Sequence, residues 1–277
     1  MSDSRSAPSE KQRTARRNAG SGWQHRVLSQ LASTSVFSQI VNATQLLERR
    51  ENGAVAVPNI VAPAQAFAAA TAITALKKQT PVIWLLTPDL RHQERVQTEL
   101  ETWGKKAHFL PELEATQTES AILDPELGAE RLHVLHRILT RRESGTNPLL
   151  INLIAASLDD PVTIPEHLAR ETLTLQSGSN DGPDPVLKML RAAGYEEHPQ
   201  IFARGQYALR GGIVDIFSFH SDVPVRLEYF DTELESIREF DINAQTSIGR
   251  VEEASIVLSE GAEESVAPLR SWVKPED

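Results

Sequence analysis

The sequence contains no cysteine among its 277 residues. This absence excludes disulfide bridges, thiolate-ligated metal sites and cysteine nucleophiles. The chain also has no apolar run near the ~20 residues that a membrane-spanning helix needs, and its first residues lack the apolar core of a signal peptide. We therefore expect a soluble, cytoplasmic protein without a membrane partner.

Basic residues are in the minority, because 28 Lys and Arg stand against 38 Asp and Glu and give a formal net charge of −10. Phosphate contacts require a basic surface, so this balance argues against a protein that binds nucleic acid over its whole surface. Residues 1–22 are polar and rich in Arg, and we predict a disordered tail there. Contact of this basic tail with nucleic acid is one alternative, and a solvated tail is the favoured one.

Residues 23–158 have the pattern of an α/β domain. Continuous apolar runs such as PVIWLLT at 81–87 and PLLINLI at 148–154 predict strands that are buried on both faces. Helical patterns alternate with them, which predicts a parallel sheet flanked by helices. The expected strands are 53–57, 81–87, 107–110 and 148–154, and the expected helices are 36–50, 63–78, 89–103 and 125–142.

Residues 159–250 predict a second, α+β domain. Short branched or aromatic runs separated by Gly, Pro and Asp are typical of an antiparallel meander. The expected strands are 173–176, 206–208, 213–217, 225–230 and 236–240, with one helix at 185–193 that ends at Gly194. Residues 251–277 are either the start of a further, truncated segment or an acidic tail, and beyond Val257 no element is expected.

No catalytic centre is recognisable in either domain. The first strand-to-helix turn of an α/β domain is the usual phosphate site, but residues 57–65 (VPNIVAPAQ) have neither glycine nor lysine, and Pro58 and Pro63 each remove a backbone donor. His133 and His136 have the spacing of a metal-binding pair on one helix, but no third ligand accompanies them. We therefore predict a non-enzymatic chain with no cofactor and no metal site.

The most informative segment runs from 194 to 247. Its residues Ile213, Asp215 and Phe217 share one strand face by alternation, and Arg226 and Glu228 alternate with apolar neighbours, which predicts a sheet with an ordered charged face. The segment resembles the module that bacterial UvrB excision-repair proteins share with transcription-repair coupling factors. The residues that carry this resemblance are Gly194, Tyr195, Gly205, Tyr207, Arg210 to Gly212, Asp215 to Phe217, Pro224, Arg226, Glu228, Phe230, Glu233, Ser236 to Arg238, Phe240, Asp241, Gln245 and Ser247.

Two absences favour the coupling-factor side of this family. The phosphate turn is degenerate, and residues 110–128 contain no aromatic side chain of the kind that wedges into DNA. The resemblance covers about residues 35–260 and implies a degenerate P-loop-like α/β domain with an inserted α+β domain that docks the UvrA subunit. Ser218 and Thr246 depart from the proline and arginine of the family pattern.

The resemblance also implies a binding site for UvrA. Arg204, Arg210 and Arg226 would contact acidic groups of the partner, Glu228 belongs to the same charged face, and Phe217 is either an apolar anchor or a core residue. Arg210 is expected to be an exposed strand residue at which a charge reversal costs little stability.

Three alternatives stay open for the chain as a whole. It is a fragment of a coupling factor or a free-standing paralogue of that protein's N-terminal module, so that RNA polymerase and DNA would be contacted only through regions absent from this chain. The enzymatic alternative is a fragment of a DNA-dependent ATPase or translocase whose motor is absent here. A decayed reading frame is the third.

Overall fold

The computed structural model describes residues 24, 26–31, 38–48, 56–57, 60–76, 81–113, 125–144, 148–244, 246–259, 265–275 and 277. The predicted tail at 1–22 lies outside these residues. Contacts divide the chain into two compact units: unit 1 is Met1–Phe109, Gly145–Ala155 and Pro275–Asp277, and unit 2 is Leu110–Ser144 and Ala156–Lys274. The domain ranges 23–158 and 159–250 stay predictions.

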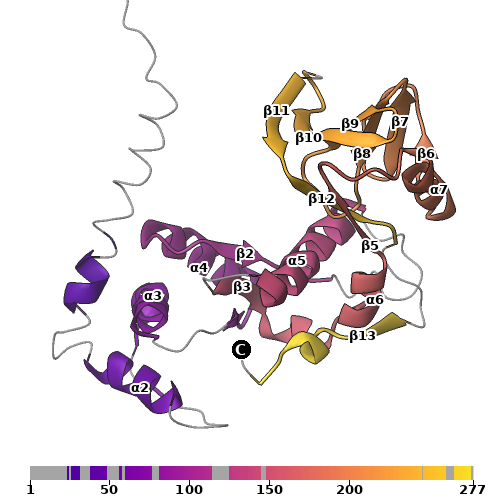
Figure 1. Cartoon of the computed structure of the whole chain (residues 1–277). Helices are drawn as coiled ribbons and strands as arrows, with labels where there is room; N and C mark the ends of the chain where they lie inside the picture. Colours follow the sequence, from indigo (N-terminus) through magenta and orange to yellow (C-terminus); the bar gives the residue numbers. More distant parts are fainter. Residues whose placement is uncertain are drawn as a thin grey trace, which may run out of the picture. The chain divides into compact units, whose positions relative to one another are not determined.

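Unit 1 contains a three-stranded parallel sheet with the strand order β1-β3-β2 (Figure 1). Every residue of the central strand β3 is buried, as its continuous apolar run predicts. The elements of the unit are α2 (Ser38–Glu48), η1 (Ala62–Ala64), α3 (Gln65–Ala75), β1 (Val82–Thr87), α4 (Leu90–Thr102), β2 (Ala107–Phe109) and β3 (Leu149–Ile154).

Helix α4 is attached to the sheet by buried amide groups. Gln93 Nε2 donates to the carbonyl oxygen of Asn152 at 2.9 Å, and Asn152 Nδ2 donates to the carbonyl oxygen of Gln93 at 3.0 Å and to Gln97 Oε1 at 3.1 Å. Gln93 and Asn152 are fully buried. Because unpaired buried amides are costly, these bonds favour one position of the helix along β3.

The sequence predicted three of these strands and the helices that accompany them, but the predicted first strand is not confirmed. Of residues 53–57, 53–55 lie outside the described residues, and Ala56 and Val57 are not in a strand. The mixed α/β class is therefore confirmed, whereas the P-loop-like ancestry of this domain stays a prediction.

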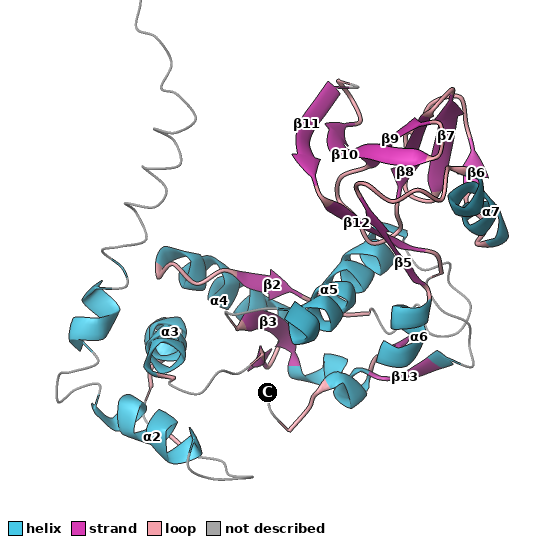
Figure 2. Cartoon of the chain, viewed as in Figure 1, coloured by secondary structure: helices cyan, strands magenta, loops and turns pink. Residues whose placement is uncertain are grey.

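Unit 2 is built around a six-stranded sheet with the order β11-β10-β9-β8-β7-β6, in which only the β6–β7 pair is parallel (Figure 2). Its larger core cluster lies on one face, where Val186, Leu187 and Leu190 of helix α7 pack against alternate strand residues such as Val214 and Leu227. The elements are α7 (Asp184–Ala192), β6 (Glu196–Glu197), β7 (Gln206–Arg210), β8 (Ile213–Phe217), β9 (Val225–Phe230), β10 (Glu233–Asp241) and β11 (Thr246–Val251). The predicted antiparallel meander is thus confirmed for the strands at 206–208, 213–217, 225–230 and 236–240. The predicted strand at 173–176 is not part of it, because β5 (Thr172–Gln176) pairs with β12 (Glu253–Val257) in a separate two-stranded sheet.

Smaller elements complete unit 2 and include residues for which no element was expected. The prediction that no element follows Val257 is wrong, because β13 pairs with β4 and the buried Trp272 of η5 donates its Nε1–H to the carbonyl oxygen of Thr163 at 2.9 Å. The elements are α5 (Pro125–Ser144), η3 (Ala155–Asp159, shared with unit 1 at its first residue), β4 (Pro161–Thr163), α6 (Pro165–Arg170), β5 (Thr172–Gln176), β12 (Glu253–Val257), β13 (Val266–Pro268) and η5 (Leu269–Trp272). In the described part of the chain, no helix has both the length and the apolar character needed to cross a bilayer.

The two glycines of the β7–β8 hairpin have different structural roles. Gly211 has a φ of +61°, which side-chain-bearing residues rarely adopt. At Gly212 the neighbouring strand is close, because a Cβ built there would lie 2.5 Å from the carbonyl oxygen of Tyr229. The Tyr229 N–H donates to the Gly212 carbonyl oxygen at 2.7 Å, so the approach is part of the sheet.

We expect Gly212→Ala to destabilise the protein by about 1–3 kcal/mol, because the added methyl group forces β8 and β9 apart. Gly249→Ala is the control, since Gly249 lies in β11 of the same sheet and a Cβ there meets nothing within 4 Å. Urea denaturation of both variants measures the difference. Equal stability of the two variants would contradict the close approach.

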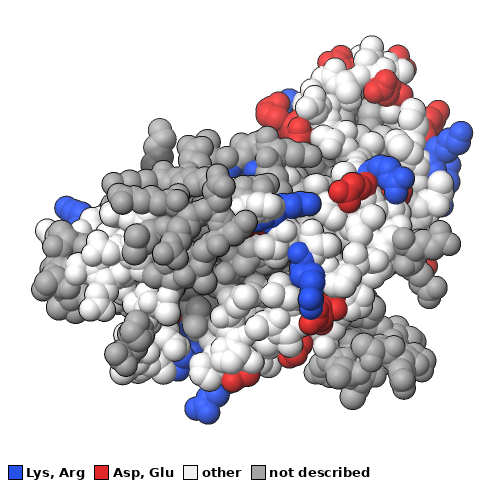
Figure 3. Space-filling view, turned by 90° about the horizontal axis from the view of Figure 1, so that it is seen from below, with Lys and Arg blue, Asp and Glu red and all other residues white. Residues whose placement is uncertain are grey.

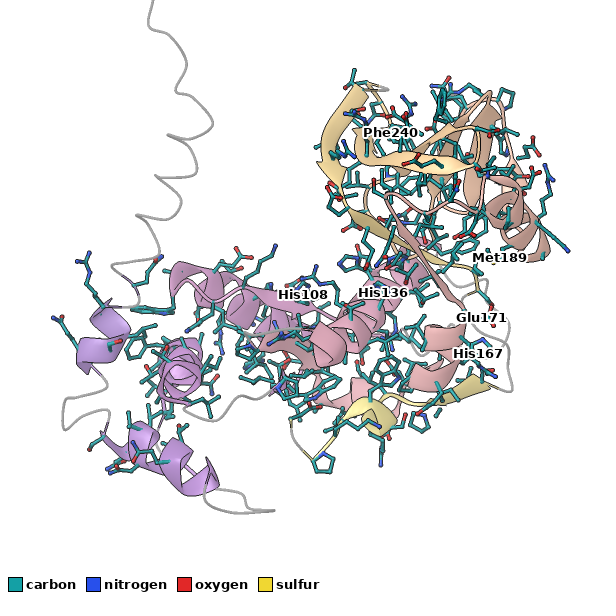
Figure 4. All side chains as sticks on the ribbon, viewed as in Figure 1. His108, His136, His167, Glu171, Met189 and Phe240 are labelled. Atoms are coloured by element: carbon teal, nitrogen blue, oxygen red, sulfur yellow. The ribbon has the colours of Figure 1, made fainter. Side chains whose placement is uncertain are left out.

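Two buried histidines join helix α5 to the loop that follows β8. The rings of His136 and His220 lie with centroids 4.2 Å apart, and His133 Nδ1 lies 3.0 Å from the carbonyl oxygen of His220 (Figure 4 labels His136). Burial, and then the nearby positive charges, lower the pKa of His136 to about 4 and that of His220 to about 3. Both rings are therefore neutral in the folded protein at neutral pH.

We expect the free energy of unfolding to fall as the pH drops from ~6.5 to ~4, because the unfolded chain takes up protons at these histidines before the folded chain does. Each histidine contributes up to ~1.4 kcal/mol per pH unit. Denaturation at pH 7 and pH 5 measures the fall, which His136→Asn should reduce. An unchanged pH dependence in His136→Asn would contradict the assignment of the fall to this histidine.

Candidate protein-interaction site

The face of the six-stranded sheet that lies opposite α7 carries a row of charged side chains. Alternation along the strands places Arg210 of β7, Asp215 of β8, Arg226 and Glu228 of β9, and Arg238 of β10 on this face, while their neighbours point into the core. The register sets Asp215 opposite Arg226 and Arg226 opposite Arg238. The sequence predicted this charged face, and the structure brings three of the predicted residues together on it: Arg210, Arg226 and Glu228.

Asp215 is the buried centre of this face. Its carboxylate accepts from Arg226 Nε at 2.7 Å and from Arg226 Nη2 at 2.9 Å, and Arg210 Nη2 donates to the same group. Only 1% of the Asp215 side chain is exposed, against 17% for Arg226 and 44% for Arg210. The hydrogen bond to Asp215 raises the pKa of the Arg226 guanidinium. The carboxylate is therefore the most buried member of this group, and Arg210 is the most exposed.

A second charged group lies beside the first. Glu228 accepts from the Ser236 hydroxyl and from Arg238 Nε, the latter at 3.1 Å. The Ser236 bond, and then the bond and charge of Arg238, lower the pKa of Glu228. Arg238 was not singled out from the sequence, although its place in the I-R-x-F-D stretch of the strand pattern was the available signal.

Arg204 lies at the far end of the same face and is already engaged. Its Nε donates to the carbonyl oxygen of Ser221 at 2.9 Å, and its two terminal nitrogens pair with Glu126 of α5 and with Asp222. Its guanidinium also lies 5.4 Å from the ring centroid of Phe217. The structure thus places Arg204 apart from the Arg210–Asp215–Arg226 group and in bonds within unit 2.

The aromatic residue predicted as an anchor, Phe217, is a core residue. Only 8% of it is exposed, and it packs with Ile201, Ala208 and Phe240. Figure 4 labels Phe240 in this sheet, and the Arg226 guanidinium lies 5.0 Å from the centroid of its ring. The apolar-anchor interpretation of Phe217 would require it to leave this cluster, so the core alternative fits its position.

Phe230 is the exposed aromatic residue of this face. It follows Arg226 and Glu228 at strand spacing on β9, and 70% of it is exposed. The sequence analysis did not identify Phe230 as an anchor. The available signal was its place as the last residue before the turn at Asp231, whose φ is +55°.

The expectation that Arg210 tolerates charge reversal does not fit its contacts. A glutamate at 210 would place a second carboxylate beside the buried Asp215, which then keeps only Arg226 as a partner. Arg210 is half-exposed and bonded rather than free. A neutral substitution therefore separates binding from stability better than Arg210→Glu.

Charge on the molecular surface is mixed rather than of one sign. On the face shown in Figure 3, several Lys and Arg side chains lie beside Asp or Glu. Among the described residues on this face, charges of the two signs are therefore interspersed.

Comparison with known proteins identifies the segment that holds this site. Residues 173–260 match the family model of the UvrB interaction domain. The predicted resemblance is thereby confirmed, and it covers strands β7 to β10, which carry the charged face.

Transcription-repair-coupling factors are similar to a longer part of the chain. The protein of Bacillus subtilis is 34% identical over 170 residues, which are 60% of this chain and 14% of the relative. The protein of Staphylococcus aureus strain USA300 is 30% identical over 195 residues, 69% of this chain and 16% of the relative. That of Haemophilus influenzae is 27% identical over 190 residues, 68% of this chain and 16% of the relative. The chain therefore spans about a sixth of the length of these curated relatives.

Proposed function

We propose that this chain is a non-catalytic module that binds UvrA in transcription-coupled nucleotide-excision repair, through the charged face of its six-stranded sheet. The similarity to transcription-repair-coupling factors and to the UvrB interaction domain supports the repair role. The observation that carries the binding proposal is the exposed Phe230 beside outward-facing guanidinium groups on a face whose central carboxylate is buried.

The chemistry of this face suits a protein partner. Arginine and aromatic residues dominate the binding energy of protein interfaces, because the planar guanidinium forms paired bonds to carboxylates and the ring buries a large apolar area. Arg210 and Arg238 have partly exposed guanidinium groups, and Phe230 adds an apolar contact at the end of the same strand row. An acidic surface with an apolar recess is the complementary partner.

We expect Phe230→Ala to weaken UvrA binding at least tenfold, because truncating an interface anchor removes more than ~1 kcal/mol. The free energy of unfolding should change by less than ~0.5 kcal/mol, since the side chain is exposed. Phe202→Ala is the matched control, because Phe202 is 67% exposed and Phe230 is 70% exposed. Phe202 precedes the first residue of β7, whereas Arg210 is the last residue of that strand. Calorimetric titration of UvrA measures both variants, and equal affinity for both would remove Phe230 from the site.

We also propose that this chain does not hydrolyse ATP, because the turn at 57–65 has no lysine to contact the phosphates and no glycine for a close backbone approach. In a phosphate-release assay with DNA present, we expect the signal of the buffer blank, with a DNA-dependent ATPase as the positive control. Turnover above the blank would favour the alternative of a translocase fragment.

A further inference from the structure

Asp215 places a charged carboxylate at a buried strand position, where an apolar side chain would be enough for packing. It lies on the charged face of the sheet, opposite Arg226 on β9 and opposite Ala208 on β7. Ala208 is fully buried and small, and Arg210, two residues further along the same strand, reaches across to the carboxylate. One acidic group thus holds arginines from both neighbouring strands.

The bonds to Asp215 leave most donors of these arginines available. Arg226 uses Nε and one N–H of Nη2, and Arg210 uses one N–H of Nη2, out of the five N–H groups that each guanidinium carries. The ring of Phe240 supports Arg226 from one side at 5.0 Å. The long side chains are therefore ordered before any partner arrives, which reduces the entropy lost on binding.

A structural ion pair elsewhere in unit 2 shows the difference. Arg131 of α5 pairs with Asp160 at 3.0 Å and also donates to the carbonyl oxygen of Pro111, and its side chain is almost fully buried. There the cation is enclosed and the carboxylate is the more exposed partner. At Asp215 the order is reversed, because the carboxylate is enclosed and its arginines are the more exposed partners, with 17% of Arg226 and 44% of Arg210 exposed.

We propose that Asp215 is a positioning residue, which holds Arg226 and Arg210 in the orientation that binds carboxylates on an acidic surface of UvrA. This proposal rests on the proposed function. Buried ion pairs contribute little to stability relative to apolar residues, so orientation of the exposed arginines accounts for a charge in this place better than stability does. A carboxylate partner is favoured over a nucleic-acid phosphate, because the face also carries Glu228 and Phe230.

The test compares Asp215→Asn with Asp160→Asn in the full chain. Asparagine keeps the shape of Asp215 but loses the charge that binds two guanidinium groups. We expect Asp215→Asn to weaken UvrA binding at least tenfold by calorimetry and to accelerate solvent exchange of the Arg226 Nε–H signal in NMR spectra. We expect Asp160→Asn to lower the melting temperature without weakening binding.

The outcomes separate the positioning role from the proposed function. If the wild-type chain does not bind UvrA, the proposed function fails, and the Arg226 signal still reports whether Asp215 orders the arginine. If the wild type binds and Asp215→Asn binds equally well, the positioning role is overturned and the function stands. If both variants lose stability and affinity in parallel, Asp215 has only a structural role.

Two further measurements cover the remaining cases. Should Asp215→Asn not fold, Arg226→Lys, which keeps the charge but cannot form the paired bond, is expected to weaken UvrA binding at least tenfold, and unchanged affinity would overturn the proposal. A short DNA duplex is titrated as a second probe. Binding of the duplex that Asp215→Asn abolishes would assign the face to nucleic acid and overturn the carboxylate partner.

Discussion

The carboxylate of Asp215 and the two arginines around it connect the fold of unit 2 with its surface. A charge that is removed from water requires partners, and here they come from the strands on either side. The pairing of β7, β8 and β9 in their observed register is what brings those partners to one place. A shift by one residue would turn the charges into the core and the core residues outward.

The register in turn depends on close contacts at the ends of the strands. Gly211 and Gly212 form the turn that directly follows Arg210, and Gly212 lies against the backbone of Tyr229. Ser218, which departs from the proline of the family pattern, is buried at the other end of β8. Its Oγ accepts the N–H of Val257 at 3.0 Å, so this departure joins the sheet to β12.

Unit 1 also contains buried polar side chains that form hydrogen bonds. Its parallel sheet is mainly apolar, and buried polar side chains in and against it are hydrogen-bonded. Gln93 and Asn152 exchange amide bonds, and Thr87 Oγ1 donates to the carbonyl oxygen of Leu153 at 3.0 Å. Those amides favour one placement of α4 but present nothing outward, since both side chains are fully buried. In the described residues of this unit, polar groups therefore serve packing, whereas those of the sheet in unit 2 also form a surface.

The sequence by itself determined the strands and helices that local pattern specifies. The run at 148–154 is apolar except for Asn152 because both faces of β3 are buried, and the alternation at 213–217 separates Val214 and Ile216 from Asp215. The glycines at 194, 205 and 211 have positive φ values, which glycine adopts more readily than other residues. The family pattern located Arg210, Arg226 and Glu228 on one face.

Only the tertiary structure decided which of these side chains are covered. Phe217 and Phe230 are both aromatic strand residues on the same face, yet Phe217 is buried because Ile201 and Phe240 approach it from distant parts of the chain. The contact of His136 with His220 likewise joins segments far apart in the sequence. The local sequence pattern predicts the face of the strand on which a side chain lies. The exposure of that side chain depends on residues from other parts of the chain that folding places beside it.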